Sequence, residues 1–261
     1  FYGTLFTEGY DFSEKFDIFS SRKVVENIRN LELNMTSIVY VKNNEGEWEE
    51  YKRLHGDENR IWTPLKKVPK NLQNALIAIE DEDFKKHHGV DWQRTFLAVA
   101  NQIFKYSSVE FGASTITQQL IKNITSDNEK VYTRKVREIV RALFIETKLS
   151  KDEILEAYLN TIALGNGING VKVAANYYFG KEVDELTIAE CACLASITKA
   201  PSYYAPDTNP ENNKKRRNTV LYEMKDQGLI TQDEYDEAVA TELKVKVNES
   251  ASANEDVNSY F

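Results

Sequence analysis

The feature that most constrains the fold is a succession of helix patterns with short connections, which fills residues 61–240. Helix start signals recur along it. Thr115 is followed three residues later by Gln118, and Ser150 by Glu153, which is the spacing of a capping box. Strands and helices do not alternate, so a parallel α/β fold is not expected. The sequence therefore predicts a mostly α-helical domain over residues 61–240.

Residues 1–60 form a different, mixed segment. An amphipathic pattern from Ser21 to Leu33 predicts a helix whose apolar side faces inward. Two β-prone runs at 37–41 and 47–51 flank the turn residues 43–46, and Asn and Gly supply the positive φ that a tight turn needs. We therefore expect a small β-hairpin before the helical domain, and a linker over residues 241–261 after it.

Composition and local motifs argue against several classes of function. The net charge of −8 argues against general nucleic-acid binding, which uses a basic surface. Cys191 and Cys193 are two apart in an apolar helix pattern and point to different faces. We expect buried thiols rather than a disulfide or a zinc site. The glycine-rich loop 164–170 lacks the lysine of a P-loop and follows no strand, so nucleotide binding is rejected.

An acidic cluster, Glu80 to Asp83, follows the apolar run 75–79. At helical spacing Glu80 lies over Leu76 and Phe84 on the apolar side, while Asp81 and Glu82 turn toward solvent. A carboxylate half inside an apolar pocket can accept a proton near neutral pH. The alternative is a solvated acidic helix end with His87 and His88 on the surface. The stretch alone favours that alternative.

Two further patterns suit an anionic ligand. The predicted helix N-terminus at Ser114–Thr115 points free N–H groups outward, and such ends attract anions. Glu138 is within one helical turn of the cations Arg134, Lys135 and Arg141, which leaves spare positive charge. The alternatives are simple helix capping and a surface ladder of ion pairs, and each is the commoner outcome for its pattern.

An apolar stripe runs along the predicted helix 92–104, with Trp92, Phe96, Val99, Ile103 and Phe104 on one side. Such a stripe can face the protein core or a lipid surface. Periodicity does not separate the two, and the core is the favoured interpretation for most of these residues.

Five ordered motifs lie within residues 69–240: Glu80, Asp81, Phe84, His87 and Gly89; Gly112 to Leu120 with Lys122 and Asn123; Arg134, Lys135 and Glu138; Lys151 to Glu156 with Tyr158, Leu159 and Asn160; and Gly170, Ala174, Ala175 and Tyr178 to Lys181. In this order they resemble the peptidoglycan glycosyltransferase family (glycosyltransferase family 51), the polymerising domain of class A penicillin-binding proteins. The family often has a glycine where this chain has Ala113.

The resemblance implies a lysozyme-like α fold and a reaction on lipid II, a disaccharide-peptide on undecaprenyl pyrophosphate. C1 of the donor's MurNAc would be joined to the 4-hydroxyl of the acceptor's GlcNAc with inversion, which releases the lipid pyrophosphate and polymerises lipid II into glycan strands. Glu80 would be the general base and Glu138 the second functional carboxylate. Substrate binding is implied for Asp81, Ser114, Gln118, Gln119, Lys122, Asn123, Arg134 and Lys135. Asp81 would orient the surroundings of Glu80 or a metal.

The resemblance also implies a place in the cell. The expected partners are a membrane surface and other cell-wall synthesis proteins, at the outer face of a bacterial cell membrane. A membrane anchor before residue 1 and a transpeptidase domain after residue 261 are expected. A divalent cation, Mg²⁺ or Mn²⁺, is compatible with the family, although no residue is assigned as a metal ligand. Two rival functions stay open: a lysozyme-like glycan hydrolase, and a non-catalytic scaffold that binds lipid II.

Overall fold

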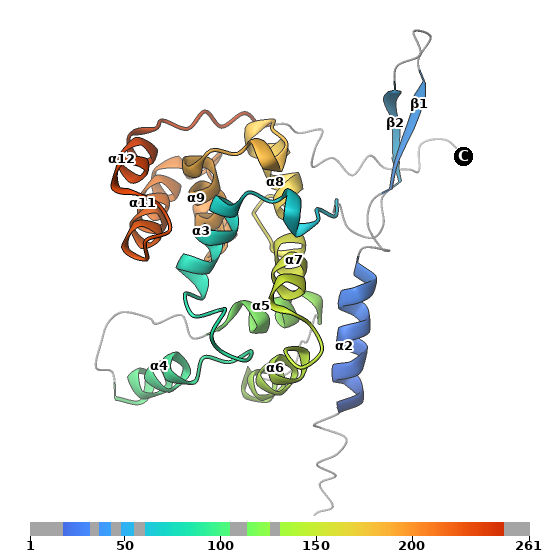
Figure 1. Ribbon diagram of the computed structural model, residues 1–261, viewed down its shortest axis with the longest axis vertical. Helices are drawn as coiled ribbons and strands as arrows, with labels where there is room; N and C mark the ends of the chain where they lie inside the picture. The colour runs from blue at the N-terminus through green and yellow to red at the C-terminus, as the bar shows by residue number, and fades with distance from the viewer. Residues whose placement is uncertain are drawn as a thin grey trace, which may run out of the picture.

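The computed structural model describes residues 18–31, 37–42, 48–54, 61–104, 114–125 and 131–247. Helices dominate these residues, which confirms the predicted mostly α class (Figure 1). In chain order the elements are α2 (Ile18–Asn30), β1 (Ser37–Lys42), β2 (Trp48–Leu54), η2 (Leu65–Lys67), α3 (Lys70–Glu80), α4 (Trp92–Phe104), α5 (Ile116–Ile124), α6 (Val131–Ile145), α7 (Lys151–Thr161), α8 (Val171–Phe179), η3 (Val183–Glu185), α9 (Ile188–Ile197), α10 (Pro201–Tyr204), α11 (Pro210–Asp226) and α12 (Gln232–Ala240).

Two groups of helices share one hydrophobic core. In the first, α9 packs between α3 and α11, and α12 covers α11. In the second, α5 packs against α6 and α7 (Figure 1). The helix α9 is buried over nearly its whole length because its residues are almost all apolar. Its C-terminal end therefore has a fixed position, which matters for the candidate site.

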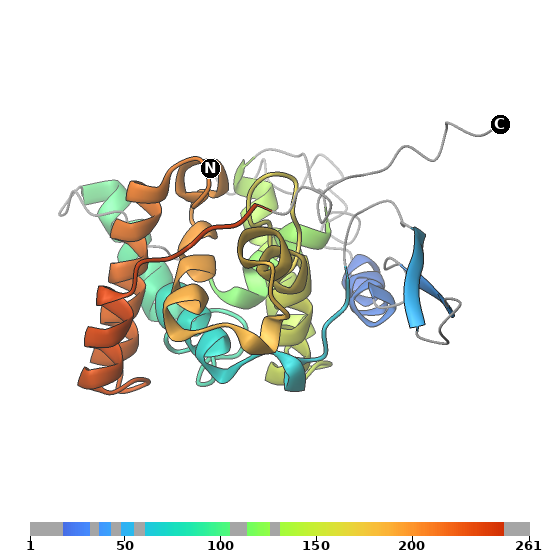
Figure 2. The ribbon, with the colours of Figure 1, turned by 90° about the horizontal axis from the view of Figure 1, so that it is seen from above.

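The chain N-terminal to residue 61 contributes to this packing. Val24, Val25 and Ile28 of α2 are buried, and α2 contacts α5 and α6. The predicted hairpin is confirmed, with β1 and β2 paired antiparallel; its turn lies outside the described residues. Seen from above, α2 and the hairpin lie at the end of the molecule opposite α11 and α12 (Figure 2).

Local capping chemistry sets several helix starts. The capping boxes predicted at Thr115 and Ser150 are both present. The helix α11 begins at Pro210, because proline fits the first turn, where its missing N–H is not needed. The extended segment before α3 is tied to α7, since Asn160 accepts from Thr63 N (2.8 Å) and donates to Thr63 O (2.9 Å).

The chain stays packed past α12. Lys246 N donates to Tyr178 O (2.8 Å), and Leu243 and Val245 pack against the core. Residues 241–247 therefore lie on the domain, inside the stretch that the sequence assigned to a linker.

The two cysteines are unpaired and fully buried, as predicted. Burial raises the pKa of Cys193 to about 12 and that of Cys191 further still.

The exposure of side chains on α4 contradicts one prediction. Trp92, Phe96 and Leu97 expose 60%, 72% and 50% of their surface, so the core position favoured for this stripe is wrong at Trp92 and Phe96. The side chains of Val99, Ile103 and Phe104 lie outside the described residues. Figure 1 shows α4 at the edge of the molecule.

Within the described part of the chain, none of the helices has the length and apolar character needed to cross a membrane.

Candidate active site

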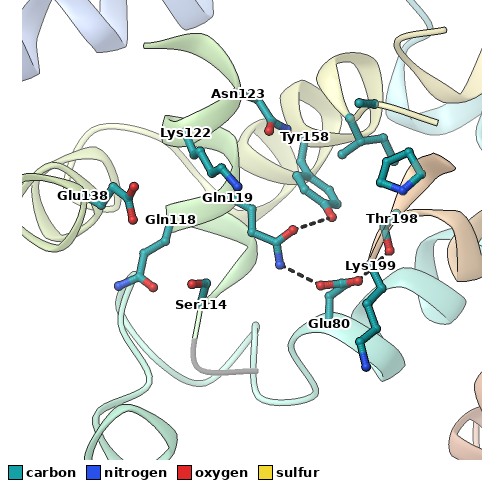
Figure 3. A pocket seen from close by; sticks show the side chains of 13 residues that line it. Glu80, Ser114, Gln118, Gln119, Lys122, Asn123, Glu138, Tyr158, Thr198 and Lys199 are labelled. Carbon is teal, nitrogen blue, oxygen red and sulfur yellow. Dashed lines mark hydrogen bonds between the residues drawn. The ribbon is translucent and has the colours of Figure 1, made fainter. Parts of the chain in front are cut away.

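A cavity of about 400 Å³ lies between the end of α3, the helices α5 and α7, and the segment after α9 (Figure 3). Seven of the ten predicted site residues line it: Glu80, Ser114, Gln118, Gln119, Lys122, Asn123 and Glu138. The other three, Asp81, Arg134 and Lys135, are not among the lining residues. The wall also contains Tyr158, Ile162, Ala163, Thr198, Lys199 and Pro201, which the sequence did not place in the site.

Glu80 is the last residue of α3, and its carboxylate is held by two donors. Gln119 Nε2 donates to Oε2 (2.7 Å) and Thr198 Oγ1 donates to Oε1 (2.5 Å). The predicted apolar setting is therefore wrong in part. Because the helix ends at Glu80, Phe84 does not follow one helical turn later but is buried in the next turn. Glu80 is half-buried among polar groups.

Tyr158 fixes the orientation of the Gln119 amide. The phenol of this fully buried tyrosine donates to Gln119 Oε1 (3.2 Å), which turns the amide NH₂ toward Glu80. Burial, and to a lesser extent the charges of Glu80 and Asp81, raises the pKa of Tyr158 well above its usual value. The phenol therefore keeps its proton and acts as a donor.

Asp81 is buried, with 1% of its surface exposed, so the expectation that it turns toward solvent is wrong. Its backbone leaves the helix at φ −159°. The carboxylate accepts from Ile116 N (2.9 Å) at the start of α5 and from His87 Nε2 (2.9 and 3.0 Å). Gly89 N donates to His87 Nδ1 (3.1 Å), which leaves the ring proton on Nε2. His87 is thus no ordinary surface residue: together with Asp81 it joins the end of α3 to the start of α5.

Glu138 lies toward the other end of the cavity wall (Figure 3). It is 7% exposed and is paired with Arg134 Nε (3.5 Å) and Lys135 Nζ (3.4 Å). The Lys135 ammonium also donates to Ser114 Oγ (2.9 Å) and to Gln118 Oε1 (3.2 Å). These contacts hold the cations in position before any ligand arrives.

Gln118 carries an unused donor. The residue is 1% exposed, and its Nε2 has no hydrogen-bond partner in the described structure. A buried donor without a partner is costly, and such groups call for an explanation. Together with the exposed ammonium groups of Lys122 and Lys199 on the wall, it gives the cavity donors that suit an anion.

A divalent cation finds no ready ligand set here. No group of three or more histidine, cysteine, aspartate or glutamate side chains is suitably placed for a metal ion in the ranges that the structure covers. Asp81 makes its contacts with His87 and a backbone N–H instead.

Two residues of this site were not indicated by any pattern in the sequence. Thr198 contacts Glu80 across 118 residues of chain, and Lys199 follows an apolar helix without any motif of its own. Their place depends on how α9 packs against α3, which periodicity does not encode.

The cavity of this helical domain has a hydrogen-bonded carboxylate on one wall and a cation-paired carboxylate on another. This combination is typical of an acid–base enzyme that acts on anionic substrates. Comparison with known families specifies this class. The transglycosylase family model matches residues 47–225, and the chain belongs to this family.

Curated relatives agree with this assignment. Penicillin-binding protein 1F of Bacillus subtilis is 46% identical over 177 residues, which is 68% of this chain and 25% of that protein. Penicillin-binding protein 1A of Neisseria gonorrhoeae is 45% identical over 191 residues, which is 73% of this chain and 24% of that protein. The chain therefore spans about a quarter of the length of these relatives.

A crystal structure of penicillin-binding protein 1A from Haemophilus influenzae matches 82% of this chain and 22% of that chain, with 26% identity and a TM-score of 0.47.

Proposed function

We propose that this domain is a peptidoglycan glycosyltransferase that polymerises lipid II into glycan strands and releases undecaprenyl pyrophosphate. The observation that carries the proposal is the pair of glutamates that line the cavity. Glu80 is held by two neutral donors, whereas Glu138 is held by two cations. One carboxylate is thus arranged to receive a proton and the other to organise positive charge.

In this proposal Glu80 is the general base. A sugar hydroxyl is a poor nucleophile, so a base has to take its proton as the bond forms. Each carboxylate oxygen accepts in two directions, and Gln119 and Thr198 use one each. Acceptor capacity therefore remains for the 4-hydroxyl of the acceptor sugar.

The donors of the cavity wall, together with Lys135, which contacts three of the lining residues, would stabilise the leaving group. Negative charge develops on the pyrophosphate as its bond to the donor sugar breaks, and donors stabilise that charge best when they are already in place. Lys135 is held by Glu138, Ser114 and Gln118. The free Nε2 of Gln118 would add an uncharged donor, with Lys122 and Asn123 on the same wall. No step of the proposal passes through Mg²⁺ or Mn²⁺.

The exposed side of α4 would contact a bilayer. Trp92, Phe96 and Leu97 form an apolar surface on the domain, and the domain would act on a lipid-linked substrate. Aromatic and apolar side chains of this kind lie in the interface of a membrane without spanning it. The proposed location is the outer face of a bacterial cell membrane.

Product analysis tests the proposal against its two rivals. The 261-residue chain is incubated with labelled lipid II in one reaction and with preformed glycan in another. Polymer from lipid II with intact preformed glycan supports the transferase. Shortened glycan without polymer would establish the hydrolase. Such an enzyme cleaves preformed glycan and does not use the pyrophosphate of lipid II. Bound lipid II with neither product would establish the scaffold.

A further inference from the structure

The hydroxyl of Thr198 has two acceptors and one proton. Its oxygen lies 2.5 Å from Glu80 Oε1 and 2.8 Å from the backbone carbonyl of Ala195. A hydroxyl donates one hydrogen bond and can accept others, and its hydrogen rotates to suit its partners. At any moment Thr198 therefore donates to only one of the two, and the other acceptor is within reach.

The second partner of Glu80 lacks this freedom. Gln119 presents its NH₂ to Oε2, and an amide nitrogen donates but does not accept. The phenol of Tyr158 on Gln119 Oε1 opposes a flip of the amide. A protonated Glu80 could therefore keep Gln119 as a donor to Oε2, but it could not give Gln119 its own proton. Of these two partners, only Thr198 can accept from the acid.

The backbone holds the threonine in place for this role. Thr198 is the C-cap of α9, and its backbone is still helical (φ −53°, ψ −34°). Carbonyls in the last turn of a helix lack helical donors, which leaves Ala195 O ready to accept a side-chain proton. Since α9 is buried, the hydroxyl is presented to Glu80 by a rigid element.

We propose that Thr198 is a positioning residue that holds Glu80 in both its charged and its protonated form by reversing the direction of their hydrogen bond. The inference deepens the proposed function and rests on the assignment of Glu80 as the base. With Glu80 ionised, Thr198 donates to Oε1. With Glu80 protonated, Oε1–H donates to Thr198 Oγ1, and the threonine proton turns to Ala195 O.

The step balances without a further reactant. The O–H bond of the acceptor 4-hydroxyl breaks and its proton forms an O–H bond on Glu80. The electron pair left on the sugar oxygen forms the bond to C1 of the donor, and the pair of the breaking C1–O bond leaves with the pyrophosphate. The reversal at Thr198 then gives the new acid proton a partner, and the carboxyl keeps its orientation until the proton passes to solvent.

Other charges also act on Glu80 and have to stay constant in a test. Arg94 donates to the Glu80 backbone carbonyl (3.4 Å), and Tyr158 contacts Gln119. The titratable groups that adjoin Glu80 or line the same cavity are Asp81, Arg94, Lys122, Glu138, Tyr158 and Lys199. Substitution of Thr198 by an uncharged residue leaves all six in place, so a changed kcat reports on the hydroxyl.

The experiment compares kcat and KM of lipid II polymerisation for Thr198→Val and Thr198→Ser. Valine keeps the shape and removes the hydroxyl, so Glu80 loses this partner in both of its forms. The kcat of the valine variant should fall by about tenfold or more, the effect of one lost hydrogen bond to a charged group. The serine variant keeps the hydroxyl and should keep the wild-type kcat, with KM unchanged in both.

Thr147→Val is the matched control. Thr147 Oγ1 also donates to the carbonyl three residues earlier, Phe144 O (2.7 Å), and it is not part of the cavity wall. The kcat of this control should match that of the wild type. If the valine variant unfolds, Thr198→Ala gives the same comparison without the branched side chain.

A wild-type kcat in a folded variant without the hydroxyl would overturn the inference. The failure of the proposed base has a different signature: polymerisation by Glu80→Gln at the wild-type rate.

Discussion

Replacement of Asp81 by asparagine should destabilise the domain although the two side chains have nearly the same shape. The new amide could keep its oxygen on Ile116 N and would then face His87 Nε2–H with its NH₂ group. Two donors would meet in a buried site. If the ring proton moved to Nδ1 instead, Nδ1 could no longer accept from Gly89 N. Either way a buried donor loses its partner.

The expected cost follows from these contacts. A buried donor or acceptor left unpaired costs about 1–3 kcal/mol, and the bond to a charged carboxylate is lost as well. We expect Asp81→Asn to lower the free energy of unfolding by about 2–4 kcal/mol, measured by urea denaturation at pH 7. Asp83→Asn is the matched control, because Asp83 pairs with the exposed Lys86 at the surface. It should unfold at the wild-type urea concentration.

A double-mutant cycle tests the cause. His87→Ala removes the opposing donor, so the combined variant should be more stable than the sum of the single changes predicts, by about 1 kcal/mol or more. Additive effects, or an Asp81→Asn variant as stable as Asp83→Asn, would refute the reasoning that Asp81 and His87 act as one buried pair.

Three further outcomes are expected. Ser150→Ala should cost about 1 kcal/mol at pH 7. The backbone N–H of Ser150 and, second, its hydroxyl lower the pKa of Glu153, and the substitution removes only the hydroxyl. The share of the hydroxyl is present above pH 4.5 and is lost as the pH falls through the lowered value, so urea titrations at pH 7 and pH 3 should show the cost shrinking. Cys193 should resist a thiol reagent at pH 8 until the protein unfolds, because its pKa is about 12. The double variant Trp92→Ser/Phe96→Ser should lose binding to anionic vesicles in co-sedimentation with its melting temperature unchanged, since both side chains are exposed.

Much of the helical framework could be predicted because it depends on local chemistry. The capping box of Ser150 and Glu153 lies within four residues, and the structure contains it. The burial of α9 follows from a nearly continuous apolar composition. Such signals act within one or two turns, so they are visible in a single sequence.

The direction of Asp81 could not be predicted in the same way. The helical pattern continues past Glu80, but the backbone leaves the helix at Asp81, whose carboxylate binds the backbone N–H of Ile116, 35 residues later. Likewise, an apolar stripe has the same period whether it faces a core or a membrane, so Trp92 and Phe96 gave no signal for their exposure. A contact between distant segments decided the direction of Asp81.

The role of Glu80 as the base of lipid II polymerisation is tested most directly by the initial rate of Glu80→Gln. Glu82→Gln serves as the control, because Glu82 is exposed on the same acidic cluster. General-base catalysis typically contributes a factor of about 10²–10⁴. We predict a loss of at least about a hundredfold for Glu80→Gln, with lipid II still bound and the fold intact, and a wild-type rate for Glu82→Gln. A Glu80→Gln rate equal to that of the control would contradict the account.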